Sequence, residues 1–489
     1  MKSPKETRRA EGRGEPGGNS FEVSQGRTQS RGTLRPNLAR VHAAARCAAQ
    51  ARFTALLHHV DEASLERAFR RQRRQAAAGV DGVTVRAYEQ NLAENLRELC
   101  TRVHTGRYRA QPVRRTYIPK ADGGKRPLGV PTLEDKIVQG AVAEVLSAIY
   151  EADFLGFSYG FRPGRNPHQA LAALHTALMS QRVTWVLDAD IRSFFDSVDH
   201  EWLLRMLAHR IADSRILRLV RRWLEAGTLE SGEIHETDRG TPQGAGISPL
   251  LANIFLHYVL DLWVHEWRRR HARGRVIIVR YADDFVMGFE KKADAERMLV
   301  DLKQRLQQFG LQLHEEKTRL IEFGRWPAIN RAQAGLPRPR TFAFLGFTHY
   351  CDWIRDGRFI VKHKTQSKRL TRKLHEVRRE AWTRMHEPLA DQHEWYASVL
   401  RGHYAYYGLP HNFRALAGFQ QELRRIWFGC LRRRSQRSRR AGWAWFEAVT
   451  DRYPLPTPRI THSWAEQRLW HVPSPSGRAG CGKAARPDL

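Results

Sequence analysis

The chain has 489 residues, 42% of them hydrophobic, and its 82 Lys and Arg residues outnumber its 51 Asp and Glu residues, for a formal net charge of +31. This length allows a large core in two or three domains, and this charge favours a nucleic acid partner, whose phosphates attract Lys and Arg. No long uncharged apolar run, signal peptide or paired cysteine spacing is evident, which argues against a membrane protein, a disulfide framework and a cysteine-based zinc site.

The N-terminal part begins with a segment that has few core-forming residues. Residues 1–35 are rich in Gly, Arg and Ser, so we expect a disordered basic arm. Over residues 38–78 the pattern is helical and basic. Residues 114–132, RRTYIPKADGGKRPLGVPT, predict a β-hairpin with an Asp-Gly turn. A helix should follow this hairpin, because Thr132 and Asp135 resemble an N-terminal capping pair.

The segment TWVLDADIRSFFD, residues 184–196, predicts a buried strand that ends before aromatic residues. Asp190 lies at the end of this strand, and Asp188 shares its face further back, because strand side chains alternate with a period of two. Asp196 and Asp199 lie beyond the turn, beside the helical start SVDHEWLL. We interpret these last two acids as helix-capping residues.

Two adjacent acids occur in VIIVRYADDFVMGF, residues 276–289, where the apolar flanks predict two short strands. Such a pair by itself most often lies in a solvated turn. At the tip of a packed hairpin, Asp283 and Asp284 would repel each other and be costly to desolvate, and a divalent cation relieves both effects. With Asp190, they could hold two metal ions about 3.5–4 Å apart for nucleotidyl transfer. We therefore expect a polymerase with two Mg²⁺ ions, for which Mn²⁺ is a substitute.

The last part of the chain combines strands with basic helices. FAFLGFTHY, residues 342–350, and GRFIVKH, residues 357–363, predict a pair of strands around a turn. Three amphipathic helices follow and predict a small basic helical domain at 366–440, which ends in LRRRSQRSRR. Within it, we expect RNA contacts at Arg432, Arg433 and Arg434.

Seven segments, in this order, resemble the bacterial group II intron-encoded proteins, which are reverse transcriptases and maturases. They are RRTYIPKADGGKRPLGVPTLEDKIVQ, FSYGFRPGRNPHQAL, LDADIRSFFDSVDHEWLL, GTPQGAGISPLLANIFLHYVLD, VRYADDFVM, LHEEKTRLIEFG and FAFLGFTHY. The resemblance covers about residues 25–475 and implies an α/β (α+β) right-hand polymerase with an antiparallel palm sheet. The domains it implies are the arm at 1–35, an N-terminal extension and fingers at 36–185, a palm at 186–355, a helical thumb or maturase domain at 366–440, and a basic tail at 441–489.

The resemblance also implies roles for residues around the reacting groups. Asp190, Asp283 and Asp284 match the three metal ligands of the family. Lys317, in EEKT, matches a lysine near the pyrophosphate that acts as a general acid. Phe195 matches the aromatic residue that crowds the sugar 2′ carbon and excludes ribonucleotides, although simple core packing is the alternative from the residues alone.

Other positions match the parts of the family that hold the triphosphate and the primer. Lys120 and Arg126 match the basic pair that grips the triphosphate, with a solvated hairpin as the alternative. Gln243 and Gly244, in TPQG, match the motif beneath the incoming nucleotide, where Gly lets backbone approach a ligand closely. The role of supporting the primer 3′ end is implied for Phe344, Leu345, Gly346 and Phe347.

The implied function is RNA-directed DNA synthesis, with assistance to splicing of the intron RNA and retrohoming by target-primed cDNA synthesis. Its partners would be intron RNA, an RNA template with a DNA primer, dNTPs and target DNA. We expect a bacterial cytoplasmic or nucleoid location without a membrane, and the oligomeric state stays open, a dimer included. Only Cys481 follows the helical domain, so we expect no His-Asn-His endonuclease, and the DNA primer would be made elsewhere.

Three alternative functions stay open at this point. A splicing-only maturase with a vestigial polymerase is opposed by the intact acids. An RNA-templated RNA polymerase is opposed by the aromatic ring of Phe195. A domesticated reverse transcriptase in host defence fits the same residues.

Overall fold

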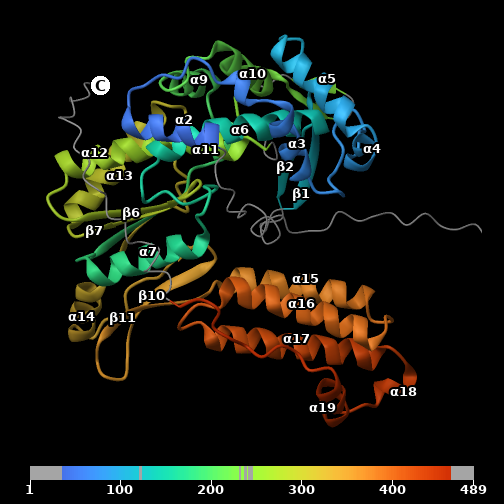
Figure 1. Ribbon diagram of the computed structural model, residues 1–489. Coiled ribbons are helices and arrows are strands. Elements are labelled where there is room, and N and C mark those ends of the chain that lie inside the picture. The colour runs from blue at the N-terminus through green and yellow to red at the C-terminus, as the bar shows by residue number, and fades with distance from the viewer. Residues whose placement is uncertain (1–35, 120–123, 231–232, 236–238, 241–245, 464–489) are drawn as a thin grey trace, which may run out of the picture.

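The computed structural model describes residues 36–119, 124–230, 233–235, 239–240 and 246–463. It is a mixed structure of helices and largely antiparallel sheets, as expected from the sequence (Figure 1). The predicted N-terminal arm and the end of the tail lie outside the described residues. Within the described ranges, no helix is both long enough and apolar enough to cross a membrane.

The N-terminal region contains several helices and a four-stranded sheet of order β2-β1-β4-β5. β1 and β2 form the predicted antiparallel hairpin, whose turn lies outside the described residues, and β4 runs parallel to β1. Helix α6 begins where expected, because the Thr132 hydroxyl accepts a hydrogen bond from the Asp135 amide at 3.2 Å. The elements are α2 (Pro36–Cys47), η1 (Leu57–His59), α3 (Glu62–Arg70), α4 (Val85–Glu89), α5 (Leu92–His104), β1 (Val113–Pro119), β2 (Lys125–Val130), α6 (Leu133–Asp153), β4 (Thr228–Glu230) and β5 (Glu233–His235).

A second four-stranded sheet, here called the central sheet, has the order β6-β7-β3-β8, and all its neighbours are antiparallel. Both of its faces are buried: Leu187 of β3 belongs to the core that includes α6, whereas the adjacent Val186 belongs to the core that includes the C-terminal helices. The strands are β3 (Trp185–Ala189), β6 (Val276–Tyr281), β7 (Asp284–Phe289) and β8 (Arg319–Glu322).

Helices cover the two faces of the central sheet. α13 contacts β3 and β7 on one face, and α7 contacts β6 on the other (Figure 1). The apolar run that includes LANIFLHYVLD forms three helical segments that follow one another directly, α11, η2 and α12. The middle segment, η2, is a π-helical turn, which the sequence pattern did not predict. The helices of this region are α7 (Pro167–Ser180), α8 (Phe194–Ser197), α9 (His200–Ala208), α10 (Ser214–Glu225), α11 (Ser248–Leu256), η2 (His257–Asp261), α12 (Leu262–Arg270), α13 (Lys292–Gln307) and α14 (Arg325–Gln333).

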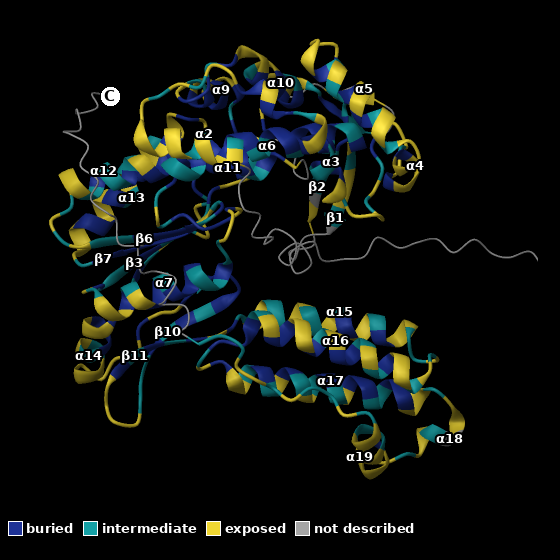
Figure 2. Cartoon of the chain, in the orientation of Figure 1, coloured by how far each residue is buried: buried dark blue, intermediate teal, exposed yellow. Residues whose placement is uncertain are grey.

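The C-terminal region joins a three-stranded sheet to a bundle of long helices. The prediction of one strand over FAFLGFTHY is wrong, because the chain reverses at Leu345 and Gly346 and forms two strands. The sequence indicated no element in the tail, where α19 lies. The elements are β9 (Phe342–Phe344), β10 (Phe347–Trp353), β11 (Phe359–Thr365), α15 (Ser367–Thr383), α16 (Leu389–Tyr407), α17 (Phe413–Arg433), α18 (Gln436–Arg439) and α19 (Trp443–Arg452). Figure 2 shows α6 largely buried, whereas α15 exposes much of its surface.

Candidate active site

The β6–β7 hairpin presents two adjacent acids at one end of the central sheet. Tyr281 pairs with Asp284, so Ala282 and Asp283 form a two-residue turn. Ala282 adopts a left-handed backbone with φ of 56°. β7 is also paired with β3 up to Phe285 and Ala189, and Asp190 follows Ala189 directly. The structure therefore brings Asp190, Asp283 and Asp284 to the same end of the central sheet.

The electrostatics of this sheet end are dominated by neighbouring carboxylates. Desolvation, followed by the negative charges of Asp283, Asp190 and Asp188, raises the pKa of Asp284 to about 7, and Arg369 opposes the shift. Many protein atoms surround the Asp284 carboxylate and partly desolvate it. The residue nevertheless remains exposed, so water can still reach it. The three neighbouring acids by themselves require an upward shift of this pKa.

Two cations from the segment around β8 neutralise part of this charge. Lys317 donates from Nζ to Asp190 Oδ2 at 2.8 Å, and Arg319 donates from Nη2 to Asp188 Oδ2 at 2.8 Å. Burial raises the pKa of Asp188, and the hydrogen bond from Arg319 opposes this rise. Lys317 thus lies at the acid cluster, as its predicted role requires. Sequence reasoning missed Arg319, although it lies two residues after Lys317 and directly opposite Asp188 in the β3–β8 register.

Several carboxylate oxygens that could bind a divalent cation lie at this end of the sheet, but they are not arranged around a common point. Among the residues that the structure describes, no group of three or more His, Cys, Asp or Glu side chains is arranged to hold a metal ion. One oxygen of Asp190 is bonded to Lys317 instead. Desolvation and crowded negative charge raise the pKa of Asp284, and a hard cation with oxygen ligands is suited to relieve both effects. The donor set therefore fits a hard divalent cation in its chemistry.

The two phenylalanines after β3 differ in burial. Phe194 is 2% exposed and packs near Phe255, whereas the ring of Phe195 is half-buried and meets Phe194 edge-on at 5.4 Å between centroids. Gly240 lies against the backbone at Phe195, because a Cβ on Gly240 would be 3.0 Å from the Phe195 carbonyl oxygen. Phe195 thus stands with part of its ring open, on α8, five residues after Asp190.

Three of the predicted nucleotide-binding residues, Lys120, Gln243 and Gly244, lie outside the described residues. Arg126 pairs through its backbone with Ile118 in the β1–β2 hairpin. Gly246 ends the gap after Gly240, and its amide donates to the side chain of Gln139 on α6 at 3.1 Å. This bond fixes the chain directly before α11.

The segment predicted to support the primer is a tight turn held by the C-terminal helices. Leu345 and Gly346 both have positive φ, 48° and 84°, between the paired residues Phe344 and Phe347. The Tyr406 hydroxyl on α16 donates to the Leu345 carbonyl at 2.9 Å. A Cβ on Gly346 would lie 3.2 Å from the guanidinium of Arg369 and from the Tyr407 hydroxyl. These contacts from α15 and α16, which sequence reasoning missed, attach the helical bundle to the turn.

The loop before α7 also reaches the acid-bearing hairpin. A Cβ on Gly160 would lie 2.2 Å from the Ala282 amide nitrogen, so only glycine allows the two backbones to approach this closely. Phe161 follows with φ of 57° and a side chain that is 46% exposed, 6.4 Å from Tyr281 between ring centroids. The segment FSYGFRPGRNPHQAL contained these residues, but no pattern within it indicated this contact.

The arginines predicted to bind RNA lie at the end of α17. Arg432 donates to the Arg439 carbonyl, and the guanidinium of Arg433 lies over the ring of Trp382 at 4.8 Å. Arg434 donates to the His386 carbonyl at 3.5 Å. Arg432 and Arg433 are exposed, so both retain N–H groups that can meet phosphate.

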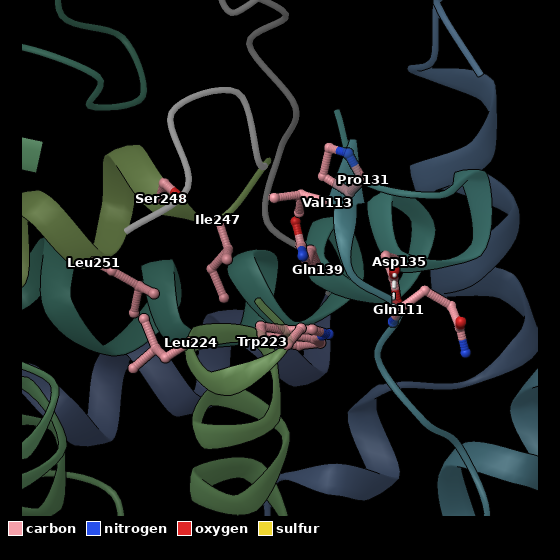
Figure 3. A pocket seen from close by; sticks show the side chains of 11 residues that line it. Gln111, Val113, Pro131, Asp135, Gln139, Trp223, Leu224, Ile247, Ser248 and Leu251 are labelled. Atoms are coloured by element: carbon pink, nitrogen blue, oxygen red, sulfur yellow. Dashed lines mark hydrogen bonds between the residues drawn. The ribbon is translucent and has the colours of Figure 1, made fainter. Parts of the chain in front are cut away.

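A small cavity lies between β1, α6, α10 and α11 (Figure 3). Asp135 and Gln139 contribute to its wall, with apolar residues such as Trp223 and Leu251. Burial raises the pKa of Asp135, while hydrogen bonds from Tyr108 and Thr132 and the Gln111 amide oppose this. Because these partners occupy both oxygens of Asp135, its carboxylate has a structural role, which is to tie the start of α6 to Tyr108 and Gln111.

Known proteins are similar to this chain over the region that carries the acids. Residues 118–349 match the family described as reverse transcriptase (RNA-dependent DNA polymerase). Protein YkfC of Escherichia coli (strain K12) is 36% identical over 273 residues, which cover 50% of this chain and 71% of that protein. Group II intron-encoded protein LtrA of Lactococcus lactis subsp. cremoris is 41% identical over 181 residues, 37% of this chain and 30% of LtrA. Nuclear intron maturase 1 of Arabidopsis thaliana mitochondria is 29% identical over 90 residues, 18% of this chain and 12% of the maturase.

The extent of these matches differs among the relatives. The chain aligns with most of YkfC but with less than a third of LtrA and of the plant maturase. The family match contains the whole central sheet, with Asp190, Asp283 and Asp284. The chain therefore belongs to the reverse transcriptases, the RNA-directed DNA polymerases, and within them to the group II intron reverse transcriptases/maturases.

Proposed function

We propose that this protein copies RNA into DNA at the end of the central sheet, by two-metal nucleotidyl transfer. The observation that supports this most is the convergence of Asp190, Asp283 and Asp284, with the pKa of Asp284 raised by desolvation and by the charges of the neighbouring acids. Reverse transcriptases use divalent metal ions, and we propose Mg²⁺, with Mn²⁺ as a substitute. When bound, such ions neutralise the leaving pyrophosphate and lower the pKa of the attacking hydroxyl.

In this proposal the side chains around the acids bind and orient the reactants. Lys317, already 2.8 Å from Asp190, would give a proton to the departing pyrophosphate. The half-buried ring of Phe195 would limit the space beside the sugar. The triphosphate would be held by Lys120, Arg126, Gln243 and Gly244, and the primer end by Phe344, Leu345, Gly346 and Phe347.

The proposed division of the chain is that of a right hand. Residues 36–185 would form the N-terminal extension and fingers, and residues 186–355 the palm around the central sheet. Residues 366–440 would form the thumb, which is also the maturase domain, and 441–489 the basic tail. The contacts of α15 and α16 with the turn at Leu345 and Gly346 support a thumb that closes on the primer end.

Primer extension on an RNA template tests the polymerase. Wild type should make cDNA in Mg²⁺, and Asp283→Ala should reduce the rate by a factor of about 10³ or more, because a metal ligand is lost. Asp356→Asn is the matched control, since Asp356 lies in the exposed turn before β11 and bonds only locally to Arg358. Absence of cDNA with wild type would refute the proposal.

We further propose that the protein assists splicing of its intron RNA and supports retrohoming by target-primed cDNA synthesis. The exposed Arg432 and Arg433 at the end of α17 support RNA binding by this region. A splicing assay on the intron RNA from the flanking DNA tests this role with the same variants. Asp283→Ala should splice as wild type does and make no cDNA. If the protein did not change the rate of splicing, the splicing role would be refuted and the proposed polymerase activity would remain.

A further inference from the structure

Arg280 on β6 has a fully buried side chain, and all five of its N–H groups are bonded within the protein. Nε and Nη2 donate to the two oxygens of Asp261, at 2.7 and 2.5 Å. Nη2 also donates to Ser158 Oγ at 2.7 Å. Nη1 donates to Asn253 Oδ1 at 3.0 Å and to the Ala282 carbonyl at 2.8 Å. The last bond reaches the turn residue directly before Asp283.

The same hydrogen-bond network also contacts the turn at Ala282 and Asp283 from its other side. Asn253 Nδ2 donates to the Gly160 carbonyl at 2.7 Å, and Gly160 lies against the Ala282 amide. The backbone of Arg280 is itself bonded to the loop, because its amide donates to the Phe157 carbonyl and its carbonyl accepts from the Tyr159 amide, both at 2.9 Å. Ala282 is therefore held in its left-handed conformation by contacts on both sides.

The π-helical turn η2 explains how one helix supplies both Asn253 and Asp261. In a regular α-helix, residues eight positions apart point about 80° away from each other around the axis. One extra residue in the turn makes them equivalent to positions seven apart, which differ by only about 20°. η2 lies between the two residues and ends at Asp261, so both side chains reach Arg280.

A stabilising role alone does not account well for this buried pair. Arg280 and Asp261 are both 0% exposed, and taking two charges out of water costs about as much as their attraction returns. Apolar pairs of similar size are often as stable or more so. What an apolar pair cannot do is donate a hydrogen bond to the Ala282 carbonyl and fix the turn.

We propose that Arg280 and Asp261 form a positioning pair, which holds the turn at Ala282 and so fixes the Asp283 carboxylate for metal binding. Arg280 acts through the backbone and touches no reacting atom. The inference rests on the proposed function, because that function makes Asp283 a metal ligand. It adds that the affinity of the site for metal is set partly by a pair buried behind it.

The experiment replaces the pair with apolar residues in the full-length protein, as Arg280→Met with Asp261→Leu. Binding of Mn²⁺ is followed by the EPR signal of the free ion, with Asp283→Asn as the baseline for loss of this site. We expect Tm to stay within a few degrees of wild type, and Mn²⁺ affinity and cDNA synthesis each to fall by about 10–100-fold, the usual effect of losing a residue that orients a ligand.

Arg210 and Asp153 provide the matched control, because a buried arginine is again paired with an aspartate, at 3.0 Å and with Asp153 14% exposed, and the other bonds of Arg210 go to carbonyls between Ala45 and Ala51. Arg210→Met with Asp153→Leu should leave Mn²⁺ affinity unchanged, whatever it does to Tm. If the Arg280 and Asp261 double variant bound Mn²⁺ as wild type does, the positioning role would be refuted.

A second variant covers the case in which the double variant does not fold. Arg280→Lys keeps the charge next to Asp261 but has three N–H groups instead of five, so it should lower Mn²⁺ affinity with little loss of Tm. Wild-type Mn²⁺ affinity in this variant would overturn the proposal. Failure of the proposed function is distinguishable, because wild type would then make no cDNA whatever the Mn²⁺ titrations show.

Discussion

At the scale of single residues, the site depends on acids whose charges oppose one another. The pKa of Asp284 is raised to about 7 by desolvation and by Asp283, Asp190 and Asp188. A carboxyl with a raised folded-state pKa binds more protons in the folded than in the unfolded protein, so folding stability falls as pH rises from about 4 to about 7. In the metal-free protein, the ionised Asp284 should therefore lower the free energy of unfolding at pH 8.

Asp284→Asn tests this linkage by thermal unfolding without metal. At pH 8 the variant should have a higher Tm than wild type, by about 1–3 °C given the solvent exposure of Asp284, and at pH 4 the difference should vanish. Added Mg²⁺ should then stabilise wild type more than the variant, because a bound cation stabilises the folded state. A Tm difference that is the same at both pH values would contradict the assignment.

Phe195 gives the second prediction at this scale. Because its ring is half-buried on α8, five residues after Asp190, Phe195→Ala should open space next to the sugar and admit ribonucleotides. We expect discrimination against rNTPs to fall by about 10²-fold, measured as the ratio of kcat/KM for dNTP and rNTP. Phe195→Tyr keeps the ring and should behave as wild type. Unchanged discrimination in Phe195→Ala would assign the ring to packing alone.

At the scale of elements, the turn at Leu345 and Gly346 is where the helical bundle meets the sheets. Gly346→Ala should both strain the backbone, since φ is 84°, and crowd Arg369 and Tyr407. Gly357→Ala is the matched control, because φ there is 78° but nothing lies within 4 Å of the added Cβ. Gly357→Ala should lose about 1 kcal/mol of stability and Gly346→Ala somewhat more, and only Gly346→Ala should also weaken primer extension. If both variants extended the primer equally well, the turn at Leu345 and Gly346 would have no role in primer support.

The sequence predicted those elements whose cause is local. The β1–β2 hairpin, the α6 cap at Thr132, the β6–β7 hairpin and the three long helices follow from turn chemistry, capping and hydrophobic periodicity. The turn inside FAFLGFTHY was missed, because an apolar run hides a left-handed Leu345 that tertiary contacts impose. The π-helical turn η2 was missed for a related reason. It orients Asn253 and Asp261 toward Arg280, a contact between distant parts of the chain that the sequence pattern does not show.

The candidate site divides in the same way. Asp190, Asp283 and Asp284 could be found from their positions at strand ends, and the structure brings them together at one sheet end. Arg319, Gly160 and the network of Arg280 could not, because their partners, Ala282 in the Arg280 network excepted, are 19 to 131 residues away in the chain. Contacts of that kind follow from the topology of the central sheet, which no local pattern encodes.

At the scale of the whole molecule, the charge of +31 predicts how RNA binding depends on salt. Each phosphate contact releases counterions, so log K falls with log salt by about 0.7–0.9 per contact. A protein with this excess of Lys and Arg should therefore lose RNA affinity steeply between 50 and 200 mM salt, by about 10³-fold if six contacts form. A shallow dependence would remove charge as the basis of RNA binding.

The position of the charge, and not its total alone, should matter for this slope. Replacing Arg432, Arg433 and Arg434 with Ala should reduce the slope by about 2 if these residues contact phosphate, because up to three counterion-releasing contacts are lost. The control replaces three exposed arginines near the end of α12, Arg269, Arg270 and Arg273, and so removes the same charge far along the chain from α17. Fluorescence anisotropy on labelled intron RNA over a salt series measures both slopes. If the two triple variants changed the slope equally, the basic end of α17 would be only part of a diffuse positive surface, and RNA recognition would have to be sought elsewhere on the molecule.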